Sequence, residues 1–238
     1  MSVLLYQSDS YLKTFEATVV AVDPGAQAVA LDRTAFYPGG GGQPPDQGWL
    51  RVGEQALPVR TVRRQGEQVW HVLQGPLPAV GTPVRGELDW ARRYQLMRTH
   101  TALHILCGVV WRDYGALVTG GNMEPLKGRM DFEFETLRQE LVREIEAKVN
   151  AEIEQGREVR VRLLPREEAL QIPDLIRTKV NLLPPDITTV RVVEIVGLDV
   201  QADGGTHVAN TREVGPVCIV NYQSKGRLNK RLHLALAP

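Results

Sequence analysis

The spacing of apolar residues changes character near residue 88 of this 238-residue chain. Up to that point, short apolar runs alternate with polar positions and are separated by Gly, Pro and Asp, which is typical of half-buried strands joined by turns. Thr18–Val22 and Ala28–Leu31 flank Asp-Pro-Gly and are typical of a hairpin. Several short strands at this spacing predict a small β-barrel. The expected strands cover residues 18–22, 28–31, 49–52, 59–62, 69–73 and 84–88.

From about Trp90 the apolar spacing becomes helical. Apolar residues cover much of the circumference of a segment that runs to roughly Asp113, which predicts a largely buried helix. Thr136-Leu-Arg-Gln139 has the pattern of a capping box and predicts the start of a second helix, which ends near Gly156. Its expected buried stripe consists of Leu137, Leu141, Ile145, Val149 and Ile153.

Strand-like alternation returns after the second helix, over residues 159–163, 190–196, 217–222 and 231–236. Helices packed on one face of a largely antiparallel sheet make an α+β domain. The chain is long enough for two modest cores, and no long linker separates the halves. We therefore expect a barrel domain over residues 1–88, which carries a glycine-rich loop, and an α+β domain over residues 89–238.

Composition and charge narrow the class of protein. Hydrophobic residues make up 43% of the chain and charged residues 24%, as in ordinary soluble globular proteins. Charges interrupt every apolar run, so we expect no membrane-spanning segment, and the N-terminus lacks the pattern of a signal peptide. Cys107 and Cys218 form no disulfide framework and have apolar neighbours, so we expect both in the core of a cytoplasmic protein.

The net charge is zero, with 28 basic and 28 acidic residues. This balance argues against indiscriminate nucleic-acid binding, which depends on neutralising phosphates, but it allows a local basic face. Most such clusters are merely solvated surface. The candidate clusters are Arg60, Arg63 and Arg64, then Arg92, Arg93 and Arg98, and finally Lys225, Arg227, Lys230 and Arg231.

Two short sequence strings contain the clearest candidates for metal ligands. They are His100-Thr-Ala-Leu-His104 and Asp203-Gly-Gly-Thr-His207. Residues four apart in a helix lie on one face, so His100 and His104 can offer two imidazoles to one ion. Imidazole and carboxylate are ordinary zinc ligands, and the strings together predict a metal site. A polar histidine pair on a helix surface is the alternative. Thr101 stands where a zinc protease helix of the HExxH type has its Glu, which excludes that class.

Three other features leave alternatives open. Asp203 before Gly-Gly is also a good turn former, so it is either a ligand or a turn residue. His71 has no ligand spacing to another histidine, and we expect it to be a partly buried strand residue.

The loop from Gly39 to Gly48 permits close approach of a ligand or of another backbone. It lacks the ending of a phosphate-cradling loop, and a surface hairpin is its alternative.

Three stretches in this order resemble the alanyl-tRNA editing proteins of the AlaX family and the editing domain of alanyl-tRNA synthetase. They are residues 31–48 with the run Gly39-Gly-Gly-Gly42, residues 100–104, and residues 204–215 from Gly-Gly-Thr-His to Glu-Val-Gly. The resemblance implies a small β-barrel followed by an α+β editing domain of the threonyl- and alanyl-tRNA synthetase type. One departure is Asp203, where the family usually has Cys. An Asp keeps the negative charge, but its harder oxygen would weaken zinc binding or admit other divalent ions.

The resemblance also implies a function, a trans-editing deacylase that hydrolyses Ser-tRNA(Ala), and possibly Gly-tRNA(Ala), at a zinc site. An alanine pocket cannot strongly reject glycine or serine, so a second sieve is needed. The expected partner is the acceptor end of tRNA(Ala), with no membrane partner and a monomeric protein. Two alternatives are a non-catalytic tRNA-binding protein with a structural metal and a metal-dependent hydrolase of small esters or amides. The expected site residues are His100, His104, Asp203 and His207 as Zn²⁺ ligands, Thr34 and Gln43 as catalytic residues, and Gly40, Gly41, Gly42, Gly205 and Thr206 as substrate-binding residues.

Overall fold

The computed structural model describes residues 2–178, 183 and 187–238. Its contacts divide the chain into two compact units, Met1–Gln95 and Leu96–Pro238. The division falls inside the long helix α1, Trp90–Tyr114, whose first residues therefore belong with the first unit.

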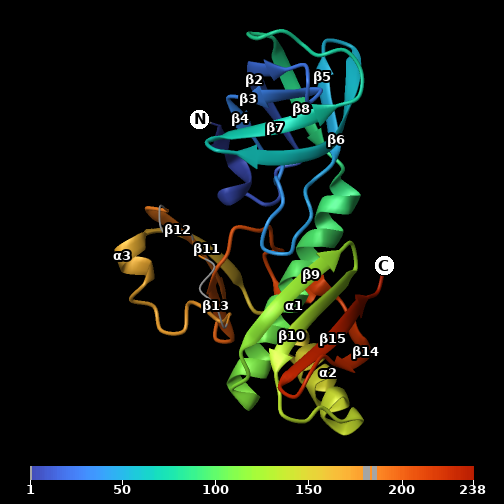
Figure 1. Ribbon diagram of the computed structural model, residues 1–238, viewed down its shortest axis with the longest axis vertical. Helices are drawn as coiled ribbons and strands as arrows, with labels where there is room; N and C mark the ends of the chain where they lie inside the picture. Colours follow the sequence, from blue (N-terminus) through green and yellow to red (C-terminus); the bar gives the residue numbers. More distant parts are fainter. Residues whose placement is uncertain (1, 179–182, 184–186) are drawn as a thin grey trace. The chain divides into compact units, whose positions relative to one another are not determined.

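The first unit is a closed barrel of antiparallel strands in the order β2-β3-β7-β6-β5-β8 (Figure 1). This confirms the small β-barrel that the alternating N-terminal pattern predicts. A short parallel pair, β1 with β4, and the 3₁₀ helix η1 accompany the barrel. The bounds are β1 Val3–Leu4, η1 Leu5–Gln7, β2 Thr14–Asp23, β3 Ala28–Leu31, β4 Arg33–Thr34, β5 Gly48–Val52, β6 Gln55–Gln65, β7 Gln68–Leu73 and β8 Pro83–Leu88.

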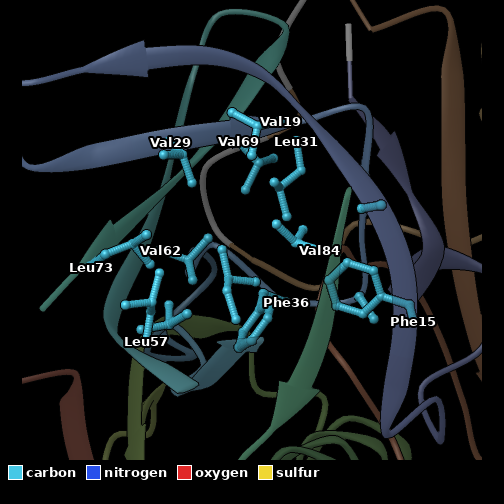
Figure 2. Close-up of a cluster of buried hydrophobic side chains, with 14 of the residues drawn as sticks. Phe15, Val19, Val29, Leu31, Phe36, Leu57, Val62, Val69, Leu73 and Val84 are labelled. Atoms are coloured by element: carbon cyan, nitrogen blue, oxygen red, sulfur yellow. The ribbon is translucent and has the colours of Figure 1, made fainter. Parts of the chain in front are cut away.

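Apolar side chains from all the barrel strands meet in its interior (Figure 2). Phe15 on β2 faces Gly86 on the paired strand β8. A Cβ atom at Gly86 would lie 2.3 Å from the Phe15 ring. The ring can therefore pack over β8 only because Gly86 has no side chain. Phe36 packs edge-on against Phe15, with ring centroids 5.8 Å apart. Aromatic packing therefore closes this part of the core.

The second unit has two antiparallel sheets, β14-β15-β10-β9 and β11-β12-β13, together with α1 and α2 (Figure 1). It confirms the expected α+β class. The sequence pattern did not predict the hairpin of β9 and β10, in which Gly and charged residues interrupt the apolar positions. The bounds are β9 Val118–Glu124, β10 Lys127–Glu133, α2 Gln139–Glu154, β11 Val159–Pro165, α3 Arg166–Ala169, β12 Thr189–Ile195, β13 Asp199–Ala202, η2 Thr211–Val214, β14 Val217–Ser224 and β15 Asn229–Leu236.

Local signals fix both ends of α1, and they confirm the predicted helix. The Asp89 side chain accepts the backbone N–H of Arg92 at 3.1 Å, as an N-cap does. Gly115 follows the last turn with φ of 62°, a conformation that favours glycine, and its N–H donates to the Trp111 carbonyl. The middle of the helix is buried, so both histidines of the first string lie inside the protein.

The predicted start of α2 at Thr136 is wrong. The helix begins at Gln139, and the preceding Arg138 is extended and makes no side-chain cap. The predicted stripe is also wrong at its start, because Leu137 lies outside the helix. A strict four-residue spacing advances by about 40° per step around a helix, so it cannot stay on one face. The buried residues are Val142, Ile145, Val149, Glu152 and Ile153.

Two smaller expectations can also be checked. Cys107 is buried in α1, but Cys218 is exposed, so the core placement of Cys218 is wrong. Cys218 lies on β14, which is an edge strand of its sheet and pairs with β15 among the described strands. Within the described ranges, no helix combines the length and the apolar character needed to cross a membrane.

Candidate metal centre

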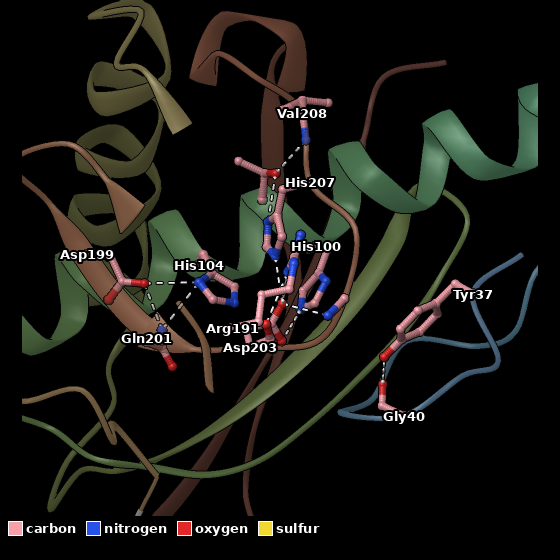
Figure 3. Close-up of polar contacts among 12 residues, drawn as sticks. Tyr37, Gly40, His100, His104, Arg191, Asp199, Gln201, Asp203, His207 and Val208 are labelled. Carbon is pink, nitrogen blue, oxygen red and sulfur yellow. Dashed lines mark hydrogen bonds and ion pairs between the residues drawn. The ribbon is translucent and has the colours of Figure 1, made fainter. Parts of the chain in front are cut away.

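Four side chains from two distant segments meet in the second unit. His100 and His104 lie one turn apart on α1, with ring centroids separated by 5.1 Å. Asp203 directly follows β13, and His207 lies in the loop after it. Helical spacing brings the first pair together, and the turn after β13 returns the second pair to the same place (Figure 3).

One donor atom from each of these four residues lies within 4.8 Å of the corresponding atoms of the others. The Asp203 carboxylate lies between two imidazoles, with Oδ2 at 3.0 Å from His207 Nε2 and Oδ1 at 3.6 Å from His100 Nε2. The His100 and His207 rings are stacked at a centroid distance of 4.2 Å. The structure thus brings together the four residues that the two strings single out.

Burial and mutual contacts set the protonation of these groups. Burial holds the pKa of His100 well below its usual value and lowers that of His207 to about 4, so both imidazoles are neutral at pH 7. Burial alone would raise the pKa of Asp203, but the contacts with His100 and His207 keep it well below its usual value. Neutral imidazole and ionised carboxylate are the forms that bind a metal ion.

Contacts outside the cluster orient two of the imidazoles. The Nδ1 of His104 lies 3.0 Å from Asp199 Oδ2. The Nδ1 of His207 lies 3.1 Å from Thr101 Oγ1, which also accepts the Val208 N–H at 3.2 Å. Both Nδ1 atoms have partners outside the cluster, which leaves the Nε2 atoms as its donors. Burial would lower the pKa of His104, but the hydrogen bond with Asp199 outweighs this effect and raises it.

The donor set fits a divalent metal ion. Three nitrogens and one carboxylate oxygen form a common zinc environment, in which tetrahedral ligand atoms lie roughly 3.3–3.5 Å apart. The 3.0 Å and 3.6 Å separations around Asp203 bracket that value. The cluster could therefore hold a metal ion after small side-chain movements.

Asp203 is at the same time the turn residue that its sequence context suggests. Its Oδ2 accepts the Gly205 N–H at 2.8 Å, which closes the turn. Arg191 is buried beside it, and its guanidinium donates to the Asp203 carbonyl at 3.0 Å. Gly205 and Thr206 are buried in the same turn. The two interpretations of Asp203 are therefore compatible, because one carboxylate in one conformation closes the turn and contacts the imidazoles.

Thr34, predicted from the resemblance to contact the substrate, lies on β4 of the first unit and is fully buried. His71 Nδ1 lies 3.3 Å from the Val29 carbonyl oxygen, which can only accept, so this nitrogen carries the proton. His71 Nε2 therefore accepts from the Thr34 hydroxyl at 2.8 Å. Thr34 Oγ1 also accepts the Phe36 N–H at 3.1 Å. His71 itself is fully buried, more deeply than expected.

The glycine-rich loop is ordered by its own backbone. Gly40 and Gln43 exchange two backbone hydrogen bonds, of 3.0 and 2.9 Å, and the Tyr37 hydroxyl donates to the Gly40 carbonyl (Figure 3). Gly40, Gly41 and Gly42 all have positive φ, which favours glycine at these positions. Gln43 is buried. The loop is therefore a tight turn with a defined conformation.

Two residues proposed for a basic surface are buried, and a third is half-buried. Arg93 is fully buried against Asp46, and Lys230 is buried with its ammonium bonded to two carbonyls. Arg98 donates to the carbonyls of Val214 and Ala237. The surface prediction is wrong for Arg93 and Lys230, because these side chains satisfy carboxylate and backbone acceptors inside the protein. Exposed members are Arg60, Arg63, Arg64, Lys225 and Arg227.

Sequence reasoning missed the residues that hold the ligands in place. Asp199, Gln201 and Asp203 occupy alternate positions along and just after β13, so they share a face. This alternation was a usable signal, because three polar side chains on one face of a strand need a common partner. Thr101 was noticed only as the residue that excludes a zinc protease, whereas its hydroxyl contacts His207.

Comparison with known families gives one match in the N-terminal part of the chain and one in the C-terminal part. Residues 190–233 match the family described as the threonyl and alanyl tRNA synthetase second additional domain. Residues 9–92 match the family described as class II (A) tRNA synthetases. The first match contains Asp203 and His207, and the second covers most of the barrel unit.

Individual relatives match nearly the whole chain. The alanyl-tRNA editing protein AlaX-M of Saccharolobus solfataricus is 40% identical over 98% of both chains. The AlaX-M protein of Methanosarcina mazei is 38% identical over 99% of this chain and 97% of its own. The alanine–tRNA ligase of Ignicoccus hospitalis is 39% identical over 91% of this chain but only 24% of its own length.

Proposed function

The chain belongs to the AlaX family of alanyl-tRNA editing proteins, as its motifs predict, and on this basis we propose that it is a deacylase that hydrolyses Ser-tRNA(Ala) in trans. Gly-tRNA(Ala) is the second substrate under this proposal. The bond that breaks is the ester between the amino acid and the terminal ribose of the tRNA. The partner is accordingly the acceptor end of tRNA(Ala), encountered in the cytoplasm.

The observation that carries the proposal is the match to AlaX-M proteins over 98–99% of this chain. The ligase relative shares the same region but extends far beyond it. An editing activity that acts separately from the ligase is consistent with this pattern. The clustered donors supply a chemical centre of the type that ester hydrolysis needs.

We propose Zn²⁺ as the ion, held by His100, His104, Asp203 and His207. When bound, zinc would polarise the ester carbonyl or orient the aminoacyl end of the substrate. Four protein donors would close a tetrahedral shell, which favours orientation over activation of water. The Asp203 carboxylate would offset one of the two positive charges of the ion, and the buried imidazoles would keep bulk water away from it.

We keep Thr34, Gln43 and the turn residues Gly40, Gly41, Gly42, Gly205 and Thr206 as proposed substrate residues. Thr34→Val keeps the shape of the side chain and removes its hydroxyl. If this hydroxyl recognises serine, hydrolysis of the serine ester falls far more than that of the alanine ester, since a polar group left unpaired costs about 1–3 kcal/mol. Equal changes in both rates would make Thr34 a purely structural partner of His71.

Single-turnover deacylation of Ser-tRNA(Ala) beside Ala-tRNA(Ala) tests the proposed function. We expect rapid loss of serine with alanine spared, about one zinc per chain by elemental analysis, and loss of both metal and activity in His207→Ala. His233, which is half-buried and lies outside the cluster, provides a control as His233→Ala. Purified protein without metal above background would refute the zinc site, and intact Ser-tRNA(Ala) would refute the activity.

The closed set of four donors specifically favours one other candidate, a tRNA-binding protein with a structural metal and no turnover. The same experiment separates the two. Zinc bound at one per chain with no deacylation of either ester would support the structural role, whereas hydrolysis of serine ester alone would exclude it.

A further inference from the structure

Asp199 is a buried carboxylate outside the four clustered donors, and it touches one of them. Its Oδ2 lies 3.0 Å from His104 Nδ1, and its side chain is 1% exposed. Gln201, two residues further along β13, donates to the same oxygen at 2.7 Å. Figure 3 shows Asp199 and Gln201 together on the side of His104 away from Asp203.

This contact determines which nitrogen of His104 carries the proton. An ionised carboxylate only accepts hydrogen bonds, so His104 Nδ1 must donate to Asp199. In the neutral ring the lone pair then stands on Nε2, the nitrogen that faces the cluster. Asp199 thus selects the tautomer that can bind a metal ion.

A glycine lets Asp199 come this close. Gly108 follows His104 by one helical turn and lies against the start of β13. A Cβ atom at Gly108 would lie 2.9 Å from Leu198 Cγ, 3.0 Å from the Leu198 carbonyl oxygen and 3.1 Å from Asp199 Cβ. Glycine inside a helix is unfavourable relative to alanine, so its presence in α1 needs a packing reason. The close approach of Leu198 and Asp199 is that reason.

A cation lies on the other side of the buried carboxylate. The guanidinium of Arg177 lies over the Trp111 ring, 4.9 Å from its centroid, and Arg177 Nε lies 3.7 Å from Asp199 Oδ1. Arg177 is itself nearly buried. A buried charge is costly unless it is paired with an opposite charge. Asp199 is therefore held between Arg177 and His104, with its charge compensated.

We propose that Asp199 is a positioning residue of the metal centre, which fixes the tautomer and orientation of His104, and that Gly108 is the position that admits it. This inference rests on the metal site of the proposed function. It predicts that zinc affinity depends on a residue that does not itself reach the cluster. Outer partners of metal-bound histidines commonly contribute roughly 10- to 100-fold in affinity.

The test compares Asp199→Asn and Gly108→Ala with Asp131→Asn, which alters a buried carboxylate that pairs with Arg231 elsewhere in the unit. Zinc affinity is measured by competition with a chromophoric chelator. We expect a loss of roughly 10- to 100-fold in the first two variants and no change in the third. If Gly108→Ala does not fold, the zinc affinity of Asp199→Asn alone tests the inference.

A metal-independent readout separates this inference from the proposed function. Long-range ¹⁵N NMR of the metal-free chain at pH 9 reports the tautomer of His104, which should be Nδ1–H in the unsubstituted chain and should lose that preference in Asp199→Asn. An unchanged tautomer together with unchanged zinc affinity in Asp199→Asn would overturn the inference. If the unsubstituted chain binds no zinc, the metal site fails, and the tautomer still decides whether Asp199 positions His104.

Discussion

At the scale of single residues, Asp203 performs two tasks that the sequence left as alternatives. Its Oδ2 accepts the Gly205 N–H and also contacts His207, while Oδ1 faces His100. Aspartate is favoured both in turns and at metal sites, so residue type alone cannot separate these roles. Only the folded conformation, in which one carboxylate reaches both groups, resolves the question.

Substitutions at Asp203 can separate the two tasks. Asp203→Cys keeps an anionic ligand but lacks the carboxylate oxygen that accepts the Gly205 N–H, whereas Asp203→Asn keeps an acceptor and loses the charge. We expect zinc affinity to be kept or increased in the Cys variant and to fall at least about tenfold in the Asn variant, because a neutral amide oxygen is a poorer zinc ligand. Chelator competition measures both. Unchanged affinity in Asp203→Ala would leave Asp203 as a turn residue only.

His71 makes the stability of the protein depend on pH. Burial lowers its pKa from 6.5 to about 4, so the unfolded chain binds a proton more readily than the folded one. The stabilisation is complete above pH 6.5 and is lost as the pH falls from there towards 4, by about 3 kcal/mol. Urea unfolding at pH 7 and pH 4 should show this loss, and His71→Gln should lose less. Equal pH dependence in both proteins would contradict the assignment.

At the scale of elements, a buried ion pair ties the glycine-rich loop to the first turn of α1. Arg93 donates to both oxygens of Asp46, and also to the carbonyls of Ala35 and Ser10. Asp46 in turn accepts the Tyr37 N–H at 2.6 Å. Arg93 therefore fixes both ends of the loop, because Tyr37 precedes the glycines and Asp46 follows them.

Breaking this pair should destabilise the barrel unit strongly. Asp46→Ala leaves the Arg93 guanidinium buried without its carboxylate, and removal of one partner of a buried pair typically costs about 3–5 kcal/mol. The double variant Asp46→Ala, Arg93→Met should be less damaging than the sum of the two single variants. Denaturant unfolding of all four proteins measures this coupling. Additive effects would show that the two side chains act independently.

The elements themselves were predictable to different degrees. Helix α1 carries its own signals, a cap at Asp89, a buried apolar segment and a terminal Gly115, and it was predicted nearly to the residue. The capping-box pattern at Thr136 was misleading, and a true capping box occurs at Asn210 with Glu213. Local patterns of four residues arise by chance, and packing against the rest of the chain decides which of them are used.

At the scale of the whole molecule, the chain order of the motifs predicted the family, and the spacing of the histidines predicted the cluster. The supporting residues could not be predicted in the same way. Asp199 meets His104 across 95 positions of the sequence, and Thr101 meets His207 across 106. Such contacts depend on how β13 lies along α1, which Gly108 permits but no local pattern specifies.

The partner prediction also belongs to this scale. The net charge is zero, and some members of the candidate basic clusters, such as Arg93 and Lys230, are buried, so phosphate contacts must come from local groups of exposed cations. Binding of tRNA(Ala) should therefore weaken only moderately with salt, since each neutralised phosphate contributes about 0.7–0.9 to the slope of log affinity against log salt. Fluorescence titrations between low and physiological salt measure this slope.

The exposed arginines of β6 and the β14–β15 hairpin offer matched variants. Arg63→Ala with Arg64→Ala tests the first cluster, and Lys225→Ala with Arg227→Ala tests the second. Removal of the cluster that contacts tRNA should lower the affinity for all tRNAs. It should also reduce the slope of log affinity against log salt by about one for each lost phosphate contact. Selection of tRNA(Ala) would then have to come from contacts with its acceptor stem. Equal deacylation of Ser-tRNA(Ala) and Ser-tRNA(Ser) would refute that selection, because hydrolysis would then depend on the amino acid alone.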